Sequence, residues 1–404
     1  MNQLLNAVTV NGRAATTKKS IADAVTTVLA DHGTSGLTHR RIAQIAQKSL
    51  SVTTYHFATK HDILAEAARG LLDDYIADFQ KVLVGIRSGK RSYPDLNAFE
   101  ARLVENAITR NRKQVLAWNE IILAAARDDA LKDITVPWFA KLQSIWQELA
   151  VELGLPNSPG VARMAIDRVV GAQLMALALN FSVENKHSLV RDGTAYVEAC
   201  RTSNSVVTAR AREGKAAIVQ EAIRKAAIDL LIQSGARAVT YRAVAEVAGV
   251  THSAPAYYFG SISGLLAAAQ TELFRAAKDR YRAGFASHGA ESVSLLGLAD
   301  ATTAIFAREA TEFSLSSTAH YSVWLEAARS DQLRHLIRIS VHDQNLAWQR
   351  RLAGFGNVGI AAAVSLQAHF IGRLLRVVAT GSRTADLADA RPDFLAALER
   401  VTGK

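Results

Sequence analysis

Two stretches of this chain carry the same pattern of residues. Residues 37–64 read LTHRRIAQIAQKSLSVTTYHFATKHDIL, and residues 239–266 read VTYRAVAEVAGVTHSAPAYYFGSISGLL. Thr38 in the first stretch aligns with Thr240 in the second, 202 positions later, and the alignment runs without a gap. Because this offset is half of the 404-residue length, the repeat predicts a complete unit that has been duplicated and fused, and not an array of small repeats.

The composition narrows the class of protein. Apolar residues make up 49% of the chain and prolines number only 6, which favours a large helical core. The net charge of +10 is consistent with an anionic partner. The single cysteine, Cys200, cannot form an internal disulfide. The sequence shows no secretory leader and no unbroken apolar run of about 18 residues, so we expect a cytoplasmic protein without a membrane partner.

The apolar spacing predicts the same order of helices in each unit. A first helix ends at a glycine, a threonine caps a short second helix, and a tight turn leads to a short third helix and a long fourth one. The expected landmarks are a first helix from Ile21 that Gly33 ends, a cap at Thr38, a third helix over Ser49–Tyr55 and a long helix from Lys60 to Ile86, followed in the second unit by a helix over Ile223–Leu231, a cap at Thr240, a third helix over Thr251–Tyr257 and a long helix from Ser261. Two short helices joined by a tight turn form a helix-turn-helix arrangement.

Both stretches resemble the DNA-binding domain of TetR/AcrR-type transcriptional regulators. They share the pattern T-x-R-x-[IV]-A-x-[IV]-A in the second helix and a closing aromatic box, which reads Tyr55-His56-Phe57 in one copy and Tyr257-Tyr258-Phe259 in the other. Residues 123–131 and 325–333 resemble a helix of the family's ligand-binding domain, again 202 positions apart. Two copies in register make this resemblance specific.

The resemblance implies an all-α fold of two tandem TetR-like units. Each unit would have an N-terminal three-helix helix-turn-helix domain and a C-terminal helical domain for ligand binding and dimerisation. The expected domains are 15–60 and 215–262 for DNA binding, and 61–204 and 263–404 for ligand sensing and dimerisation.

In this family the last two long helices of two subunits form a four-helix interface, so one fused chain would form an intrachain pseudo-dimer. We expect these helices at 160–182, 189–203, 358–380 and 386–401, with a linker near 203–215. Gly171 and Gly372 should permit close helix approach. The sequence leaves open whether fused chains dimerise further.

The third helices offer small polar or compact side chains that suit base edges, and hydrogen-bond donors around them suit phosphates. The predicted base contacts are Ser49, Leu50, Ser51, Thr53 and Thr54 in the first copy and Thr251, His252, Ser253 and Ala256 in the second. The predicted phosphate contacts are Thr38, Arg40, Arg41, Tyr55, His56 and Lys60, and Thr240, Arg242, Tyr257 and Tyr258. The alternative interpretation assigns the arginines to an ordinary solvated helix face and the tyrosines to the core. Phe57 and Phe259 are expected to be core anchors.

Each copy departs from the family pattern at a different place. Gln47 stands where the family has a glycine, which the second copy retains as Gly249. A left-handed backbone at Gln47 would cost roughly 1 kcal/mol. The second copy has Ile262 where the first has Lys60, so it lacks the cation that opens the next helix. We call the two helix-turn-helix domains, expected at 15–60 and 215–262, the first and the second head. Either head could bind DNA more weakly, and we expect the two heads to recognise unlike half-sites.

Apolar and aromatic stripes between the heads predict a ligand pocket, although the same stripes fit an ordinary core. The candidate pocket residues are Trp118, Trp138, Trp146, Met175, Tyr321, Trp324, Trp348 and His369. Their character favours a hydrophobic effector. The histidines of the first head have no metal-ligand spacing, and no catalytic constellation is present. We therefore predict no enzyme activity, no metal and no cofactor.

These observations predict a transcriptional regulator, acting as a repressor, that binds double-stranded DNA with two helix-turn-helix heads. A small-molecule effector would release it from its operator. The alternative is a ligand-binding or protein-interaction module in which one or both heads are degenerate.

Overall fold

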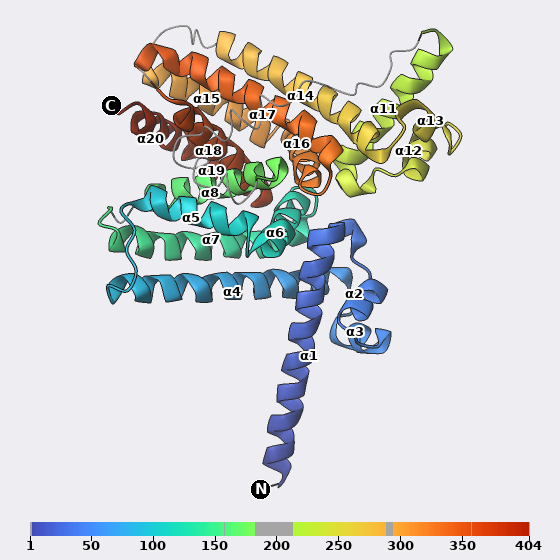
Figure 1. Cartoon of the computed structure of the whole chain (residues 1–404), viewed down its shortest axis with the longest axis vertical. Helices are drawn as coiled ribbons and strands as arrows, with labels where there is room; N and C mark the ends of the chain where they lie inside the picture. Colours follow the sequence, from blue (N-terminus) through green and yellow to red (C-terminus); the bar gives the residue numbers. More distant parts are fainter. Residues whose placement is uncertain (1, 157, 182–212, 288–293, 357, 404) are drawn as a thin grey trace.

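Helices make up the fold in the part of the chain that the computed structural model describes, which is residues 2–156, 158–181, 213–287, 294–356 and 358–403 (Figure 1). No strand occurs in those ranges, in agreement with the predicted all-α class. The first half contains α1 (Asn2–His32), α2 (His39–Ile45), α3 (Leu50–His56), α4 (Lys60–Arg87), α5 (Leu96–Ile108), α6 (Arg112–Ala125), α7 (Asp129–Glu152) and α8 (Pro159–Leu179). The second half contains α11 (Lys215–Ser234), α12 (Tyr241–Ala248), α13 (Ala254–Phe259), α14 (Ile262–Ser287), α15 (Leu295–Ala310), α16 (Ser314–Ala327), α17 (Asp331–Leu352), α18 (Ile360–Ala379), α19 (Thr384–Ala388) and α20 (Ala390–Thr402).

The helices of the two halves correspond one to one from α1 to α8 and from α11 to α18. Helices α6 and α16 begin and end 202 positions apart, and α7 and α17 begin at that same offset. Short 3₁₀ turns at Thr34–Gly36 and Ala236–Ala238 follow α1 and α11. The repeat in the sequence is therefore also a repeat of helices, and it extends well beyond the two stretches that carry the matching motif.

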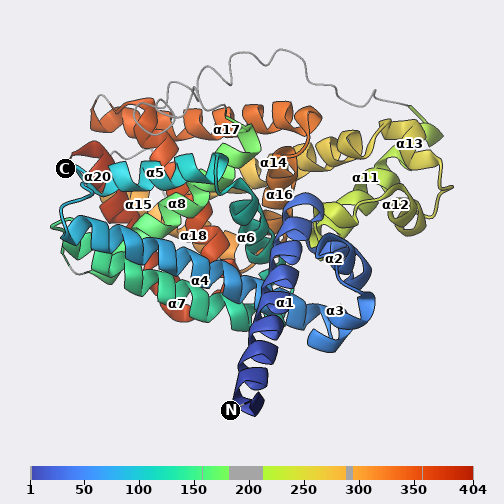
Figure 2. The ribbon, with the colours of Figure 1, turned by 60° about the horizontal axis from the view of Figure 1, so that its bottom comes forward.

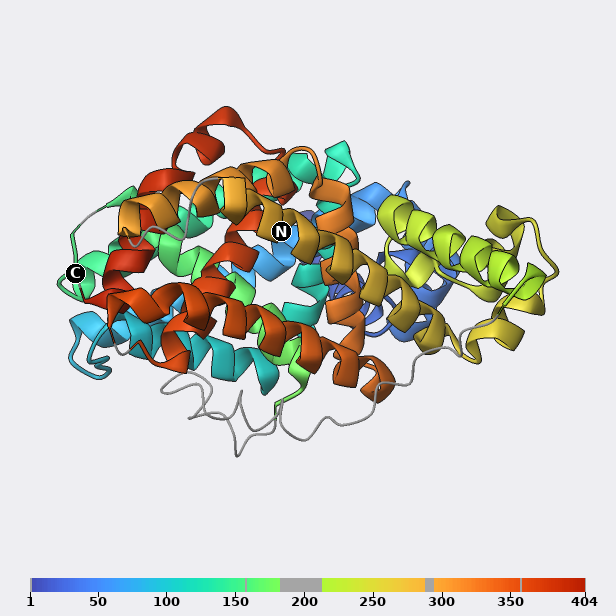
Figure 3. The ribbon, with the colours of Figure 1, turned by 90° about the horizontal axis from the view of Figure 1, so that it is seen from above.

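The helical body is layered around α8 and α18, which cross in its middle (Figure 1). Helices α4, α5 and α7 lie on one side of this crossing, and α14, α15 and α17 lie on the other (Figure 1). The helix-turn-helix elements α2–α3 and α12–α13 lie at the same end of the body in all three views (Figures 1, 2 and 3). The architecture thus places two similar heads side by side at one end of a shared body.

Two glycines make the central crossing close. A Cβ atom built on Gly171 of α8 would lie 1.9 Å from the carbonyl oxygen of Ala368. A Cβ atom on Gly372 of α18 would lie 1.7 Å from the carbonyl oxygen of Asp167. Because only a residue without a Cβ fits at either position, the prediction that these glycines permit close helix approach is confirmed.

Buried charges cross the same interface. Arg376 of α18 donates to both carboxylate oxygens of Asp167 on α8, at 2.6 and 3.0 Å. The neighbouring Arg373 is fully buried, lies 3.6 Å from Asp167 and pairs with Asp393 of α20. Buried ion pairs of this kind stabilise little against an apolar alternative, but they leave an uncompensated charge if the helices slip. The pairs therefore fix how the two halves are placed against each other.

Several predicted boundaries are wrong. Helix α1 starts at Asn2 and not at Ile21, so the apolar stripe marks only its packed end. Helix α8 ends before residue 182 because Asn180 adopts a left-handed conformation with φ of 49°. The helix expected at 386–401 is divided into α19 and α20 around Asp389. The helix expected at 189–203 lies outside the described residues, as does nearly all of the linker expected at 203–215.

One helix in the described residues, Ile360–Ala379, is long and apolar enough to cross a membrane by length and composition alone. Within its most apolar window, 78% is buried inside the protein. The apolar character of α18 is thus accounted for by its place at the central crossing, where the helix packs against α8.

Candidate nucleic-acid interface and ligand cavity

The first head is built on a capped helix and a strained turn. The side chain of Thr38 accepts a hydrogen bond of 3.2 Å from the backbone N–H of Arg41, which caps α2 as predicted. The turn to α3 passes through Gln47, whose φ is 53°. Lys48 closes the turn by donating from its backbone N–H to the carbonyl oxygen of Ala43 at 2.9 Å. Gln47 therefore adopts the left-handed conformation, with the cost that this implies for a residue other than glycine.

The second head repeats this design with a glycine at the turn. Thr240 accepts a hydrogen bond of 3.2 Å from the backbone N–H of Ala243, and Gly249 has a φ of 65°. The Tyr241 hydroxyl donates to the carbonyl oxygen of Gly260 at 3.0 Å, which ties α12 to the end of α13. The second head therefore reaches the same backbone geometry without the strain of a side chain in the left-handed region.

Most of the predicted DNA contacts are exposed on the heads. Tyr55 is 86% exposed and Tyr257 is 67% exposed, so neither tyrosine is a core residue. Phe57 and Phe259 are buried and anchor α3 and α13, as predicted. The other exposed candidates are Thr38, Arg40, Ser49, Leu50, Ser51, Thr54, Lys60, Thr240, Arg242, Thr251, His252 and Ser253. The half-buried candidates are Arg41, His56, Ala256 and Tyr258.

The prediction of a base contact is wrong for Thr53. This residue is 0% exposed, and its hydroxyl donates to the carbonyl oxygen of Leu50 at 2.8 Å. Thr53 therefore lies on the buried face of α3 and cannot reach a base. Arg41 is also engaged within the protein, because its guanidinium donates to the carbonyl oxygen of Gly36 at 2.8 Å.

We call α3 and α13 the candidate recognition helices, and the second of them is shorter than predicted. Helix α13 begins at Ala254, so Thr251, His252 and Ser253 precede it. Pro255 lies at the start of the helix, where a residue without a backbone N–H is tolerated. The polar candidates of this head consequently lie on the turn that leads into α13, whereas Ser51 and Thr54 of the first head lie on α3 itself.

The junction after each recognition helix also differs. In the first head Thr59 and Asp62 form a reciprocal capping box, and Lys60 is the first residue of α4. Although Lys60 is exposed, neighbouring protein atoms partly desolvate its ammonium group and lower its pKa, and the charge of Asp128 opposes this effect. In the second head Ser261 accepts a hydrogen bond of 2.9 Å from the backbone N–H of Gly264. The helix after α3 thus begins with a cation, Lys60, whereas the helix after α13 begins with Ile262.

Each head is held by an arginine from the opposite half. Arg329, just after α16, donates from Nε to the carbonyl oxygen of Ala30 at the end of α1, at 2.5 Å. Arg127, just after α6, donates from Nε to the carbonyl oxygen of Ile232 at the end of α11, at 2.8 Å. A guanidinium at the carbonyl end of a helix satisfies free acceptors and the negative end of the helix dipole. We call Arg127 and Arg329 the cross-half arginines.

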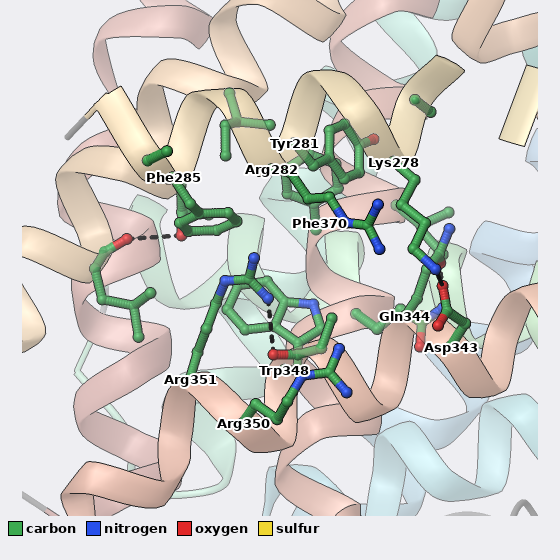
Figure 4. A pocket seen from close by; sticks show the side chains of 18 of the residues that line it. Lys278, Tyr281, Arg282, Phe285, Asp343, Gln344, Trp348, Arg350, Arg351 and Phe370 are labelled. Carbon is green, nitrogen blue, oxygen red and sulfur yellow. Dashed lines mark hydrogen bonds and ion pairs between the residues drawn. The ribbon is translucent and has the colours of Figure 1, made fainter. Parts of the chain in front are cut away.

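A cavity of about 1220 Å³ lies inside the body of the second half, between α14, α15, α16, α17 and α18. The candidate pocket residues Tyr321 and Trp348 line it, together with Tyr281, Phe285 and Phe370 (Figure 4). A cavity of this volume is large enough for a drug-sized ligand, for which sites of roughly 300–1000 Å³ are usual.

Charged and polar groups interrupt the apolar wall of this cavity. Lys278 and Asp343 form an ion pair of 2.6 Å across it (Figure 4). The guanidinium of Arg351 stacks on the ring of Phe285, with its carbon 3.7 Å from the ring centroid. Burial, with a smaller contribution from the charge of Arg350, lowers the pKa of Arg351 to about 10. Nonpolar surface and desolvated positive charge therefore occur together in one cavity.

Three of the predicted pocket residues of the first half, all of them tryptophans, form a packed cluster. Trp118 and Trp138 stack with ring centroids 3.6 Å apart. Trp146 donates from Nε1 to the hydroxyl of Tyr75 at 3.3 Å and lies against Phe79. All three tryptophans are buried in this cluster, which favours the core interpretation for them over the pocket interpretation.

The remaining three pocket candidates lie outside the large cavity. Trp324 is fully buried against His320 and Tyr321 and does not line the large cavity. His369 is fully buried against the ring of Phe394, where desolvation lowers its pKa well below the usual value. Met175 lines a separate groove of about 730 Å³ between the two halves. Aromatic stripes alone did not distinguish packed cores from a cavity.

The sequence reasoning missed the polar residues of the cavity, chiefly Lys278, Asp343, Gln344, Arg350 and Arg351. The signal was available in the repeat, because several of them occupy positions where the first half has aliphatic residues. Among the described residues there is no cluster of three or more His, Cys, Asp or Glu side chains that could hold a metal ion.

Two family models match parts of the chain. Residues 94–200 match the model described as Tetracyclin repressor-like, C-terminal domain. Residues 223–269 match the model described as Bacterial regulatory proteins, tetR family. A comparison with curated proteins gave no match. The chain thus contains a TetR-type DNA-binding domain and a TetR-type C-terminal domain, which together are the domains of a DNA-binding transcriptional regulator with a ligand-binding domain.

Proposed function

We propose that this chain is a single-chain repressor built from two fused TetR-type units. The observation that carries the proposal is the reciprocal contact of the cross-half arginines. Each unit supplies one arginine to the head of the other, and both heads lie at one end of a common body. This is the arrangement expected of a dimeric DNA reader whose subunits have become one chain.

The order of the family matches supports the same proposal. The matched C-terminal domain, at 94–200, precedes the matched DNA-binding domain, at 223–269. A single regulator would have the opposite order. Two fused units explain it, because each match then falls on a different unit. Helices α6 and α16 correspond at an offset of 202 positions. This correspondence supports the presence of both domain types in each unit, including the parts that no family model matches.

The two heads are expected to read unlike half-sites in successive major grooves, about 34–36 Å apart. The first head presents Ser51 and Thr54 on a helix, whereas the second presents His252 and Ser253 on the preceding turn. Effector binding in the body would release DNA if the two states of the protein differ in affinity for the effector.

A second candidate is a ligand-binding or protein-interaction module in which one head no longer reads DNA. Gln47 strains the turn of the first head, and Ile262 replaces the cation that the first head offers at Lys60. These two departures motivate the alternative, since each weakens a different head.

Selection of bound sequences from random duplex DNA by the purified protein, at near-physiological salt, tests both candidates. We expect two different enriched half-sites at a fixed spacing, with an affinity that falls steeply as salt rises. Enrichment of a single half-site would show that one head has been lost. Absence of any enrichment would overturn the proposed regulator and favour the module.

A further inference from the structure

The bodies of the two halves differ in polarity at several positions that surround the cavity. Lys278, Gln344 and Arg351 line the cavity of the second half. At the aligned positions, 202 residues earlier, the first half has Ile76, Leu142 and Leu149. Three polar or charged side chains thus stand where the other copy has aliphatic ones. Polar groups in a largely apolar wall are costly unless they have a partner.

Part of the cavity corresponds to a region of the first half that an aromatic side chain occupies. Ala277 lines the cavity, and its counterpart in the first half is Tyr75, which packs against Trp138 with ring centroids 6.1 Å apart. The counterpart of Trp138 is Ser340, which is buried and does not line the cavity. At the position of Ala277, the first half therefore has a large aromatic side chain where the second half has a small one that borders open space.

The positive charge in the cavity exceeds the negative charge. Four basic residues line it, Lys278, Arg282, Arg350 and Arg351, against the single acidic residue Asp343. Asp343 is engaged by Lys278. Among the described residues no carboxylate pairs with Arg350 or Arg351, whose side chains lie next to the cavity (Figure 4). The cavity consequently offers guanidinium groups beside aromatic surface, which suits an anion with an apolar body.

The buried side-chain amide of Gln367 is a further polar group in the cavity wall. Gln367 is 2% exposed and donates from Nε2 to Oε1 of Gln344 at 2.5 Å. Its own Oε1 has no hydrogen-bond partner among the described residues, although the side chain lines the cavity. A buried acceptor without a partner costs about 1–3 kcal/mol, so a hydroxyl or N–H group on a ligand would be stabilised there.

We propose that only the second half binds the effector, that one molecule binds per chain, and that this molecule is an amphipathic anion whose carboxylate or similar group faces Arg350 and Arg351. The inference rests on the proposed function, because it names the ligand of the regulator's sensing body. The apolar part of the ligand would contact Phe285, Trp348 and Phe370.

Calorimetric titration of the full chain without DNA tests the ligand class and the stoichiometry. The probes are dodecanoate, dodecanol and dodecyltrimethylammonium, which share an apolar tail and differ in head-group charge. We expect dodecanoate to bind with a ratio of one per chain and at least tenfold more tightly than either analogue. Equal affinity for dodecanol, tighter binding of the cation, or a ratio of two per chain would overturn the inference.

Two matched variants place the anion. Arg351→Gln removes a charge beside the cavity, whereas Arg275→Gln removes a charge from the exposed surface of α14, where Arg275 pairs with Glu272. We expect R351Q to weaken dodecanoate binding roughly tenfold or more, as for a lost hydrogen bond to a charged group, and R275Q to change it less than twofold. Equal effects of the two variants would contradict the placement.

The same preparations separate this inference from the proposed function. Binding of the selected DNA is measured by fluorescence anisotropy, without ligand. If DNA binds and dodecanoate shows no preference over its analogues, the ligand class is wrong and the regulator stands. If dodecanoate binds as expected and no DNA sequence is selected, the cavity assignment stands and the proposed regulator is wrong.

Discussion

Tyr321 of the cavity wall and Arg329, which holds the first head, lie on one short segment of chain, eight positions apart. Tyr321 belongs to α16 and Arg329 follows its last turn. A helix moves as a rigid body, so a displacement of the cavity wall also displaces this arginine. The second half is thus connected to the head of the first half, and not only to its own.

We predict that Arg329→Gln uncouples the ligand from DNA. R329Q should bind dodecanoate as tightly as the wild type, because Arg329 lies outside the cavity. Dodecanoate should, however, lower its DNA affinity much less than the 5–150-fold range that is usual for coupled sites. Fluorescence anisotropy with the selected DNA, with and without dodecanoate, measures the ratio.

Arg127→Gln is the matched control, since it removes the equivalent contact, 2.8 Å from Nε to the carbonyl oxygen of Ile232. Arg127 follows α6 of the half whose body is filled by aromatic rings, so R127Q should keep the ligand response. A similar loss of the response in both variants would show that the coupling does not run through α16.

The central crossing gives a second prediction. Gly171→Ala or Gly372→Ala would place a methyl group less than 2 Å from a backbone carbonyl oxygen. The helices must then separate, and we expect a loss of about 3 kcal/mol or more in the free energy of unfolding. The control is Gly70→Ala in α4, where nothing lies within 4 Å of the added atom. G70A should stabilise the protein by about 0.5–1 kcal/mol through helix propensity. Urea denaturation measures all three, and stable G171A and G372A variants would contradict the close crossing.

Local chemistry made part of this molecule predictable. The caps at Thr38 and Thr240 and the left-handed turn at Gln47 depend on neighbouring residues, and they follow from sequence spacing alone. The cavity depends on which side chains from five separate helices face one another. Trp138 and Trp348 occur on similar apolar stripes, yet Trp138 is packed against another ring and Trp348 borders open space. Only the three-dimensional packing separates these two cases.

The pH dependence of stability should carry the signature of a buried histidine. Burial, and to a smaller extent the charge of Arg280, lowers the pKa of His320 to about 3. The unfolded chain has a histidine pKa near 6.5, so between these values it binds a proton that the folded protein does not. The free energy of unfolding therefore falls as the pH drops below about 6.5, by about 2 kcal/mol at pH 5 from this residue.

Urea denaturation between pH 7 and 5 tests this prediction. His320→Asn should reduce the loss of stability over that interval, whereas His252→Asn, on the exposed surface of the second head, should leave it unchanged. His369 is shifted in the same direction, so some pH dependence should persist in H320N. A slope that is the same in H320N and in the wild type would contradict the assignment.

The strained turn of the first head should be improvable. Gln47→Gly removes a left-handed side chain that costs about 1–2 kcal/mol but adds chain entropy to the unfolded state, worth about 0.4–1 kcal/mol. We expect Q47G to stabilise the first head by roughly 0.5–1 kcal/mol, visible as slower hydrogen exchange of the α2 amides. The reverse change in the other head, Gly249→Gln, should accelerate exchange in α12 by a similar factor. Faster exchange in Q47G would show that Gln47 makes a compensating contact.

The filled body of the first half gives the last prediction. Trp138→Ala removes a ring that stacks on Trp118 at 3.6 Å and leaves a void in a packed core, which costs about 3–5 kcal/mol. The hydroxyl of the aligned residue Ser340 donates to the carbonyl oxygen of Leu336 on its own helix. Ser340→Ala should therefore change the free energy of unfolding by less than about 1 kcal/mol. Equal costs for W138A and S340A in urea denaturation would mean that the two bodies are packed alike, and the assignment of ligand binding to one half would lose its structural basis.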